Sequence, residues 1–399
     1  MNKAKFVAAL VIPCLISSCG IFETSVSGKL KNDTVWKGRV VLTGDVIIEP
    51  DVTLTIMPGT KVAYTKKSDF THTVEIIRNV MGTTKNVLKS EKIEIVVQGV
   101  LKINGQAKRR VLFNEEKNPN AGSIAFFGRR SDSRIRFCKI NTDDVAVRCY
   151  DYSNPVIESS EIIENKVGAI GCWDAATPVI RNSRIMNNKY GIGCSDLSRA
   201  KIINNEIKGN TATGVFCEGS SISEISGNSI SGNNVGVASG NLSSPLVYSN
   251  DLSGNGTGIG CWGKSSPEVS SNTIHGNVAG ILSVDESAPS IAGNRVYENG
   301  SGMACGNSST PLITGNRVYD NQQGIVCSDT MFGKILKNLI ENNKTGVESG
   351  DVSSPSIVSN IFRKNQVVFV NGKNATPRIG ENTYDGNAVK TQGGKESGK

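Results

Sequence analysis

Asparagine recurs at a fixed step through more than half of this sequence, and that step restricts the folds open to the chain. Self-similarity at one period is the signature of a solenoid, in which each repeat packs only on its neighbours. Stacked coils place equivalent side chains about 4.8 Å apart, so their amides can form hydrogen-bonded ladders. One series, with steps of 22 or 23 residues, comprises Asn165, Asn188, Asn210, Asn233, Asn255, Asn277, Asn299, Asn321, Asn343, Asn365 and Asn387. A second series, five residues earlier, comprises Asn205, Asn228, Asn250, Asn272, Asn294, Asn316, Asn338, Asn360 and Asn382.

Three aliphatic columns accompany the asparagines in the repeating unit P-x-I-x-x-N-x-I-x-x-N-x-x-G-I-x-C. Short β-branched segments bounded by Asn, Gly or Ser-Pro predict three strands per coil. We expect the glycine before the third column, as at Gly191 and Gly214, to supply a bend with positive φ. No segment has a helical period. The sequence therefore predicts an all-β fold, a right-handed parallel β-helix with 22-residue coils and three strands per coil. The columns are Ile157, Ile180, Ile202, Ile225, Val247, Val269, Ile291, Ile313, Ile335, Ile357 and Ile379; Ile162, Ile185, Ile207, Ile230, Leu252, Ile274, Val296, Val318 and Ile340; and Ile192, Val215, Val237, Ile259, Ile281, Met303, Ile325 and Val347.

The repeated motif N-x-I-x-x-N-x-x-G-I resembles the parallel β-helix repeats of NosD-like and pectate-lyase-like proteins. Residues 44–60 (GDVIIEPDVTLTIMPGT) are similar to the opening coils of secreted bacterial members. The resemblance covers about residues 38–387. This scaffold carries lyases, hydrolases, epimerases and plain binding proteins, so the resemblance implies a fold without selecting an activity.

The N-terminus has the features of an export signal. Residues 1–18 carry Lys3 and Lys5, then a short apolar run, and the lipobox-like sequence Ile16-Ser17-Ser18-Cys19 follows this run. This pattern predicts a signal peptide over 1–18 and lipidation at Cys19. Cleavage near Ser18 without lipidation is the alternative. The expected location is extracytoplasmic, as a membrane-anchored lipoprotein of the outer membrane or cell surface.

The remaining chain divides by pattern. We expect a lipid anchor and linker over 19–37, N-terminal capping coils over 38–148 with a loop excursion at 65–93, regular repeats over 149–387, and a disordered tail over 388–399. Between Lys61 and Arg110 there are eleven Lys or Arg and four Asp or Glu, followed by Arg129, Arg130, Arg134 and Arg136. Such charge protects strand edges from aggregation, or attracts anionic headgroups or glycan. It lacks the interleaved aromatics of nucleic-acid sites. The oligomeric state stays open.

Seven cysteines occupy one column of the repeat, with serine in its gaps. A position that accepts Cys or Ser favours small buried side chains, so we expect free thiols. Parallel stacking holds Cβ atoms about 4.8 Å apart, farther than the roughly 3.8 Å of a disulfide. In-line sulfurs also do not suit a tetrahedral metal. The column contains Cys149, Cys172, Cys194, Cys217, Cys261, Cys305 and Cys327, with Ser239, Ser283 and Ser349.

Familiar catalytic motifs are missing from the sequence. His72 and His275 are the only histidines, which excludes a histidine-cluster copper or zinc site and the copper-related role linked to some NosD-like proteins. The segment 141–144 (NTDD) resembles the acidic motif of polygalacturonases, but their later Gly-His-Gly and Arg-Ile-Lys elements are absent and Asp143 aligns with the asparagine column. The Asp-Pro-His signature of alginate epimerases is also absent. His275 belongs to a column that we expect to be a variable solvent face.

One outward group combines aromatic rings with carboxylates: Tyr150, Asp151, Trp173, Asp174 and Asp196. Aromatic platforms beside hydrogen-bonding acids suit a sugar ring, and carboxylates one coil apart can hold Ca²⁺. They can also act as general acid and base if their pKa values differ. The alternative is that Asp and Asn form the turn through local backbone bonds, since they recur in nearly every coil.

These observations favour a lipid-anchored protein that binds glycan or another extended polymer without catalysis. No resident cofactor is expected, and Ca²⁺ is the one ion left open. Two alternatives stay open. One is a polysaccharide lyase or hydrolase that uses Asp151, Asp174 and Asp196. The other is a structural or adhesive surface rod.

Overall fold

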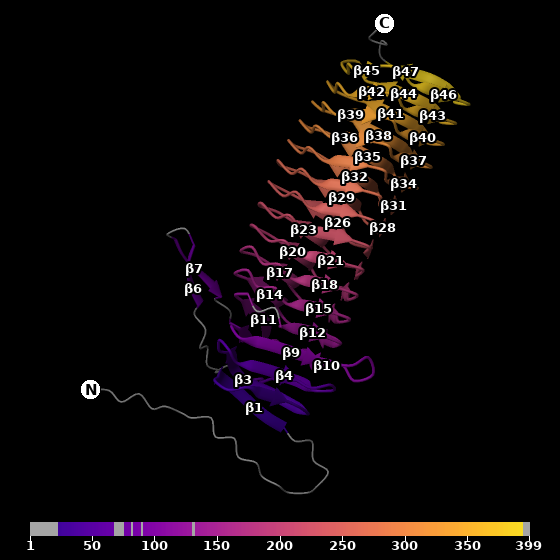
Figure 1. Cartoon of the computed structure of the whole chain (residues 1–399). Helices are drawn as coiled ribbons and strands as arrows, with labels where there is room; N and C mark the ends of the chain where they lie inside the picture. The colour runs from indigo at the N-terminus through magenta and orange to yellow at the C-terminus, as the bar shows by residue number, and fades with distance from the viewer. Residues whose placement is uncertain (1–22, 68–75, 81–82, 89–90, 130–131, 394–399) are drawn as a thin grey trace.

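The chain folds into one elongated solenoid of stacked, mostly parallel strands (Figure 1). The computed structural model describes residues 23–67, 76–80, 83–88, 91–129 and 132–393, with backbone alone between 76 and 88. All regular elements in these ranges are strands. The signal peptide and Cys19 lie outside the described residues.

Each coil contributes one strand to each of three faces, which we number in chain order. Two longer strands, β1 (Glu23–Leu30) and β3 (Arg39–Ile48), begin the solenoid and pair with each other. The first face comprises β2 (Thr34–Trp36), β4 (Thr53–Ile56), β9 (Val100–Asn104), β12 (Arg134–Arg136), β15 (Val156–Glu158), β18 (Val179–Arg181), β21 (Lys201–Ile203), β24 (Glu224–Ser226), β27 (Leu246–Tyr248), β30 (Glu268–Ser270), β33 (Ser290–Ala292), β36 (Leu312–Thr314), β39 (Lys334–Leu336), β42 (Ser356–Val358) and β45 (Arg378–Ile379).

The other two faces belong to one continuous sheet. The second face comprises β5 (Lys61–Tyr64), β10 (Val111–Phe113), β13 (Cys138–Ile140), β16 (Glu161–Ile163), β19 (Arg184–Met186), β22 (Glu206–Lys208), β25 (Ser229–Ser231), β28 (Asp251–Ser253), β31 (Thr273–His275), β34 (Arg295–Tyr297), β37 (Arg317–Tyr319), β40 (Leu339–Glu341), β43 (Ile361–Arg363) and β46 (Thr383–Asp385). The third face comprises β8 (Ile93–Val97), β11 (Ala121–Phe127), β14 (Val145–Tyr150), β17 (Gly168–Cys172), β20 (Tyr190–Cys194), β23 (Thr213–Cys217), β26 (Val235–Ser239), β29 (Thr257–Cys261), β32 (Ala279–Ser283), β35 (Ser301–Cys305), β38 (Gln323–Cys327), β41 (Thr345–Ser349), β44 (Val367–Asn371) and β47 (Val389–Gly393).

The core is a stack of aliphatic side chains in register. Ile157 pairs with Ile180, and the pairing continues in step along the first face. Nearly all members of the three predicted columns are fully buried. The predicted fold class, a parallel β-helix with three strands per coil, is confirmed.

Both asparagine ladders are present. Asn299 donates from its backbone N and from Nδ2 to Oδ1 of Asn321, at 3.0 and 3.1 Å. Its own Oδ1 accepts the two equivalent bonds from Asn277. Nδ2 also donates to the backbone carbonyl of Ile274. Each buried amide is therefore saturated, which is required where water is absent.

The glycines ahead of the third column have a different role from the one expected. Gly191 and Gly214 do not have positive φ. A Cβ at Gly191 would lie 2.2 Å from the carbonyl oxygen of Gly214, so glycine here allows close approach between coils. Positive φ occurs instead just before the ladder asparagines, as at Asn187 (φ 57°) and Gly209 (φ 65°).

The ends of the solenoid differ from the expected boundaries. Strands β1 and β2 lie in the segment assigned to anchor and linker, and β47 enters the expected tail. The excursion at 65–93 contains an antiparallel hairpin of β6 (Ile76–Val80) and β7 (Thr83–Leu88). The described part of the chain has no helix that is long and apolar enough to cross a bilayer.

The cysteine column is buried and reduced, as predicted. Cys149, Cys172 and Cys194 occupy equivalent positions on successive third-face strands. All eight cysteines among the described residues are free and buried. Burial raises the pKa of the Cys261 thiol, and raises the pKa of Cys305 to about 12.

Candidate ligand-binding face

Three rings stack outside the third face at the ends of consecutive strands. Phe127 and Tyr150 have ring centroids 5.1 Å apart, and Tyr150 and Trp173 are 5.0 Å apart, with interplanar angles of 17° and 18°. Tyr150 is only 9% exposed, whereas Trp173 is half-buried. The proximity expected for Tyr150 and Trp173 is therefore present, with Trp173 as the more accessible ring.

The predicted aspartates lie in the turn that follows the third face. Asp151, Asp174 and Asp196 all have left-handed backbone, with φ of 54°, 49° and 57°. Asp and Asn tolerate this conformation better than other non-glycine residues. Farther along the same turn column, Asp329 Oδ2 accepts a hydrogen bond of 3.0 Å from the backbone N of Asn307 in the preceding coil. These positions suit turn formation, and the three carboxylates need no further role to explain their residue type.

A buried ionic cluster beside Tyr150 was missed by sequence reasoning. Arg148 Nη2 lies 2.6 Å from Asp144 Oδ2, and Nη1 lies 3.9 Å from Glu94 Oε1. Burial opposes its charge, but Glu94 and Asp144 raise the pKa of Arg148 above its ordinary value. Burial also raises the pKa of Tyr150 to about 12. One guanidinium thus pairs with two carboxylates near the Tyr150 phenol, which is protonated at neutral pH.

The aromatic series continues along the third face, where rings lie against glycines. A Cβ at Gly171 would fall 2.0 Å from the indole Cη2 of Trp173. A Cβ at Gly193 would fall 2.6 Å from Cε1 of Phe216. Tyr190 contacts Phe216 edge-on at 5.7 Å. Glycine leaves room for a ring to rest on the sheet, which a side chain would prevent.

Trp262 continues this series two coils after Phe216, and its ring lies near glycines of two neighbouring coils. A Cβ at Gly240 would lie 2.4 Å from its Nε1, and a Cβ at Gly260 would lie 2.8 Å from its Cζ3. The indole is half-buried, so part of it faces solvent. We call the set Phe127, Tyr150, Trp173, Tyr190, Phe216 and Trp262 the aromatic row. It follows the third face from β11 to β29, six strand spacings or about 29 Å.

The family follows from comparison with known proteins. A family model described as the right-handed β-helix region matches residues 80–221, 168–306, 213–362 and 258–395. These matches cover more than half of the chain. The chain belongs to the right-handed β-helix family. A search of curated protein sequences returns no match.

Solved structures of other β-helix proteins are similar at low identity. A variant of the periplasmic alginate epimerase AlgG is 14% identical with a TM-score of 0.49, over 87% of this chain and 78% of that one. The A-module of the Azotobacter vinelandii mannuronan C-5 epimerase AlgE6 is 13% identical with a TM-score of 0.36, over 89% and 91%. Pectate lyase Pel9A is 11% identical with a TM-score of 0.27, over 84% and 70%. At these values we draw no conclusion about activity.

Asp143 of this β-helix protein does not occupy the asparagine column as expected. Thr142 takes that position, because its backbone N donates to Oδ1 of Asn165 at 2.7 Å. Asp143 instead pairs with Lys166 and Lys92. Burial opposes ionisation, but hydrogen bonds from both lysines hold the pKa of Asp143 below its ordinary value.

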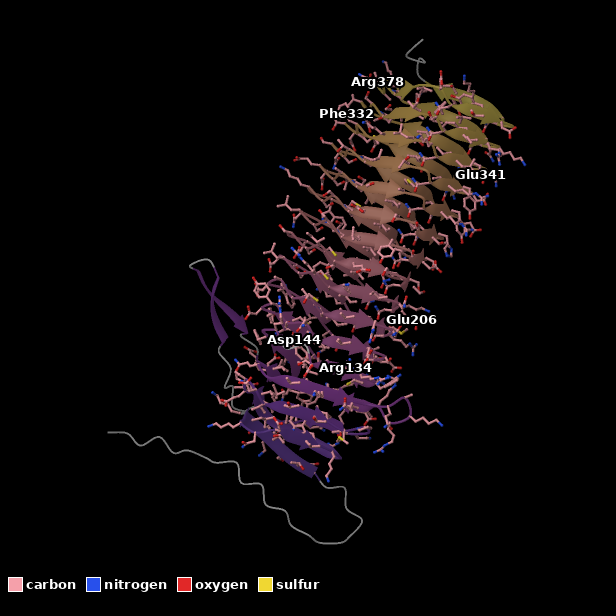
Figure 2. The ribbon with its side chains drawn as sticks, in the orientation of Figure 1. Arg134, Asp144, Glu206, Phe332, Glu341 and Arg378 are labelled. Atoms are coloured by element: carbon pink, nitrogen blue, oxygen red, sulfur yellow. The ribbon has the colours of Figure 1, made fainter. Side chains whose placement is uncertain are left out.

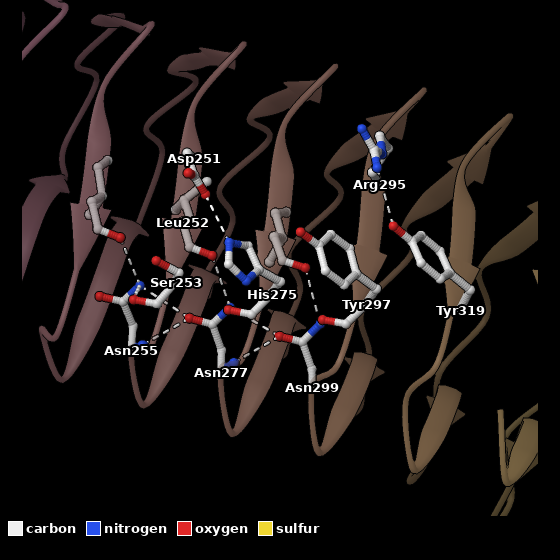
Figure 3. A network of polar contacts seen from close by, with 12 residues as sticks. Asp251, Leu252, Ser253, Asn255, His275, Asn277, Arg295, Tyr297, Asn299 and Tyr319 are labelled. Atoms are coloured by element: carbon white, nitrogen blue, oxygen red, sulfur yellow. Dashed lines mark hydrogen bonds and ion pairs between the residues drawn. The ribbon is translucent and has the colours of Figure 1, made fainter. Parts of the chain in front are cut away.

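A second aromatic stack of this β-helix lies on the second face, on a column expected to be variable solvent surface (Figure 3). His275 and Tyr297 stack at 4.9 Å with an angle of 3°, and Tyr297 and Tyr319 at 4.9 Å and 15°. Asp251 contacts the His275 ring at 3.1 Å, and Arg295 reaches the Tyr319 hydroxyl at 3.3 Å. The rings cover one another's faces, so mainly their edges remain for a ligand.

Two small clefts lie apart from the aromatic row, one of them near Val368 and Tyr384. A cleft of about 140 Å³ near Leu112, Asn141 and Glu164 contains none of the predicted site residues. Among the described residues, no group of three or more His, Cys, Asp or Glu has a metal-binding arrangement. Phe127 and Tyr150 at the start of the aromatic row are each only 9% exposed, whereas the row is partly exposed from Trp173 to Trp262. This accessible part suits a ligand that extends along the solenoid.

Proposed function

We propose that the protein is a lipid-anchored, extracytoplasmic solenoid that binds an extended polysaccharide along its third face without cleaving it. The aromatic row is the observation that carries this proposal. Its rings lie along one face, on the five consecutive coils from β11 to β23 and then on the coil of β29, which matches a ligand that is itself a linear repeat. The lipobox-like sequence ending at Cys19 supports anchoring.

The chemistry of the row favours sugar rings. Aromatic side chains offer apolar surface to the C–H faces of pyranoses, and neighbouring polar groups then select orientation. Asp174, Asp196 and Glu218 border the row at its turn, the last accepting a hydrogen bond from Ser195 at 3.1 Å. Carboxylates accept hydrogen bonds from hydroxyl groups and repel anions. We therefore propose a neutral, hydroxyl-rich glycan as the ligand.

Binding without cleavage is supported by the role of the aspartates. Asp151, Asp174 and Asp196 share left-handed turn positions with Asn241 and Asn307, where asparagine cannot act as an acid or base. A catalytic pair needs carboxyl groups with separated pKa values that enclose the scissile bond. The lyase or hydrolase alternative makes a distinct prediction: incubation with glycans generates new unsaturated or reducing ends.

The proposal is tested by affinity electrophoresis in gels that contain neutral or anionic glycans. Trp173→Ala and Trp262→Ala should each weaken binding to a neutral glycan by about tenfold, the scale of one lost aromatic stacking contact. Phe332→Ala is the matched control, because Phe332 is 59% exposed but lies outside the row. Equal losses in all three variants, or no retardation by any glycan, would contradict the proposal and favour the structural rod.

A further inference from the structure

Arginines gather around one buried glutamate on the first face. Arg181 Nη2 lies 2.7 Å from Glu158 Oε2, while Arg134 Nε and Arg136 Nε lie 3.6 and 3.7 Å from Oε1. The glutamate side chain is 11% exposed, whereas the three arginine side chains are 45–51% exposed. One carboxylate cannot neutralise three guanidinium groups, so donors and charge remain directed to solvent.

More positive charge surrounds this group. Lys102 pairs in register with Arg134 on the next strand. Across the bend to the second face, Arg110 lies 3.7 Å from Glu161, and its guanidinium stands 6.0 Å from the ring of Phe137. Arg136 stands 5.1 Å from the same ring. We call Lys102, Arg110, Arg134, Arg136 and Arg181, with Glu158 and Glu161, the cationic corner. Its cations exceed its carboxylates by three.

A balanced counterpart lies in the C-terminal half of the solenoid (Figure 2). There Glu341 pairs with Arg317 at 2.6 Å and with Arg363 at 3.5 Å, and Arg363 also lies 3.4 Å from Asp385. Two cations thus meet two carboxylates. The same arginine–glutamate arrangement occurs in both places. The surplus is larger at the cationic corner, because the counterpart gains only Arg295 when the cation in register with Arg317 is included.

We propose that the cationic corner docks the solenoid on an anionic lipid surface. Basic side chains near an anionic bilayer each contribute to binding within a screening length of the surface. The corner is built on short strands of adjacent coils, and its half-exposed guanidinium groups form an array on the outer surface of the solenoid. A planar headgroup layer contacts such an array without any shape requirement.

The position of the corner fits this occupant. Three residues separate Cys19 from Glu23, where β1 begins, and these four residue steps span at most about 14 Å. A lipid at Cys19 would hold the N-terminal coils close to the bilayer, and β12 is the fourth strand from that end of the first face. In a three-sided coil, the bend between the first and second faces lies opposite the third. Docking through this corner directs the aromatic row away from the membrane.

The test measures partition of the full-length protein into phosphatidylglycerol-containing vesicles and into pure phosphatidylcholine vesicles at low salt. The difference between the two compositions cancels the contribution of any acyl chain. We expect wild type to prefer the anionic vesicles, and Arg134→Gln with Arg136→Gln to reduce that preference by about tenfold or more. This double variant leaves the 2.7 Å pair of Arg181 with Glu158 intact. Salt at about 1 M, where the screening length is about 3 Å, should abolish the preference.

Arg317→Gln with Arg363→Gln removes the same net charge from the balanced counterpart and should leave the preference unchanged. A circular dichroism melt of both double variants checks that each is folded. Equal partition of wild type into the two vesicle types would overturn the proposal, as would equal losses in both double variants. Binding to soluble polygalacturonate without preference for anionic vesicles would also overturn it, assigning the corner to an acidic glycan. Neutral-glycan affinity, measured separately, reports on the aromatic row and not on this corner.

Discussion

The indole of Trp262 lies over Gly240 of the preceding coil, where a Cβ would come within 2.4 Å of the indole Nε1. Gly240→Ala should lift the ring and weaken neutral-glycan binding by about tenfold, because the ring no longer rests on the sheet. The glycine does not have positive φ, so alanine fits its backbone. Gly350→Ala is the control, because Gly350 occupies the same position in a later coil. A Cβ there would meet only a carbonyl oxygen, at 3.7 Å. Matching affinities for the two variants would refute a binding role for Trp262.

Asn299→Leu should lower the free energy of unfolding by about 1–3 kcal/mol. The substitution removes the acceptor of two bonds from Asn277. The buried backbone N of Asn277 would lose its partner, whereas Nδ2 would keep its bond to the carbonyl of Leu252. Gln322→Leu changes an exposed neighbour and should leave unfolding nearly unaltered. Chemical denaturation of the three proteins measures the difference, and an unchanged midpoint for Asn299→Leu would contradict the ladder's contribution.

The buried thiols predict both reactivity and alkaline stability. Folded protein should react with a thiol reagent at none of its column cysteines, and unfolded protein at all of them.

Burial raises the pKa of Cys305 from about 9 to about 12, so the folded state retains a proton that the unfolded state releases in this range. The stability contribution is therefore complete below about pH 9 and declines as pH rises towards 12. Denaturation midpoints measured across this range should fall, and a rise would reverse the assigned sign.

Cys19→Ala should abolish incorporation of labelled fatty acid and make membrane association sensitive to salt. Without an acyl chain, only the cationic corner would hold the protein, and high salt screens that attraction. Fractionation before and after a salt wash provides the measurement. Salt-resistant association of Cys19→Ala, together with wild type that carries no acyl chain, would refute lipidation.

Asp174→Asn should preserve the fold, because asparagine occupies the same turn position at Asn241 and Asn307. Calorimetric titration with Ca²⁺ should then give equal heats in wild type and variant, since the carboxylate serves the turn rather than a cation. Heat seen only in wild type would instead establish a calcium site at Asp151, Asp174 and Asp196.

The candidate site was only partly predictable from sequence. Tyr150 and Trp173 share one position of the repeat, so their proximity followed from the period. Tyr190 and Phe216 occupy different positions within their coils, and they meet because the Phe216 ring lies over Gly193, three residues after Tyr190. The role of Gly191 was misassigned, since a glycine that avoids a clash and a glycine that permits positive φ are identical in sequence.

The repeat was enough to predict the solenoid, its three buried columns, the two ladders and the free thiols. In stacked coils, one period in sequence equals one strand spacing, so residues one repeat apart must touch. Which side chains meet on the outer surface became visible only in the folded chain. Rings reach sideways over glycines of neighbouring coils, and Lys102, Arg134 and Arg181 converge although their spacing in the chain is irregular. Such contacts depend on side-chain direction and on what adjacent coils leave empty, and neither is periodic.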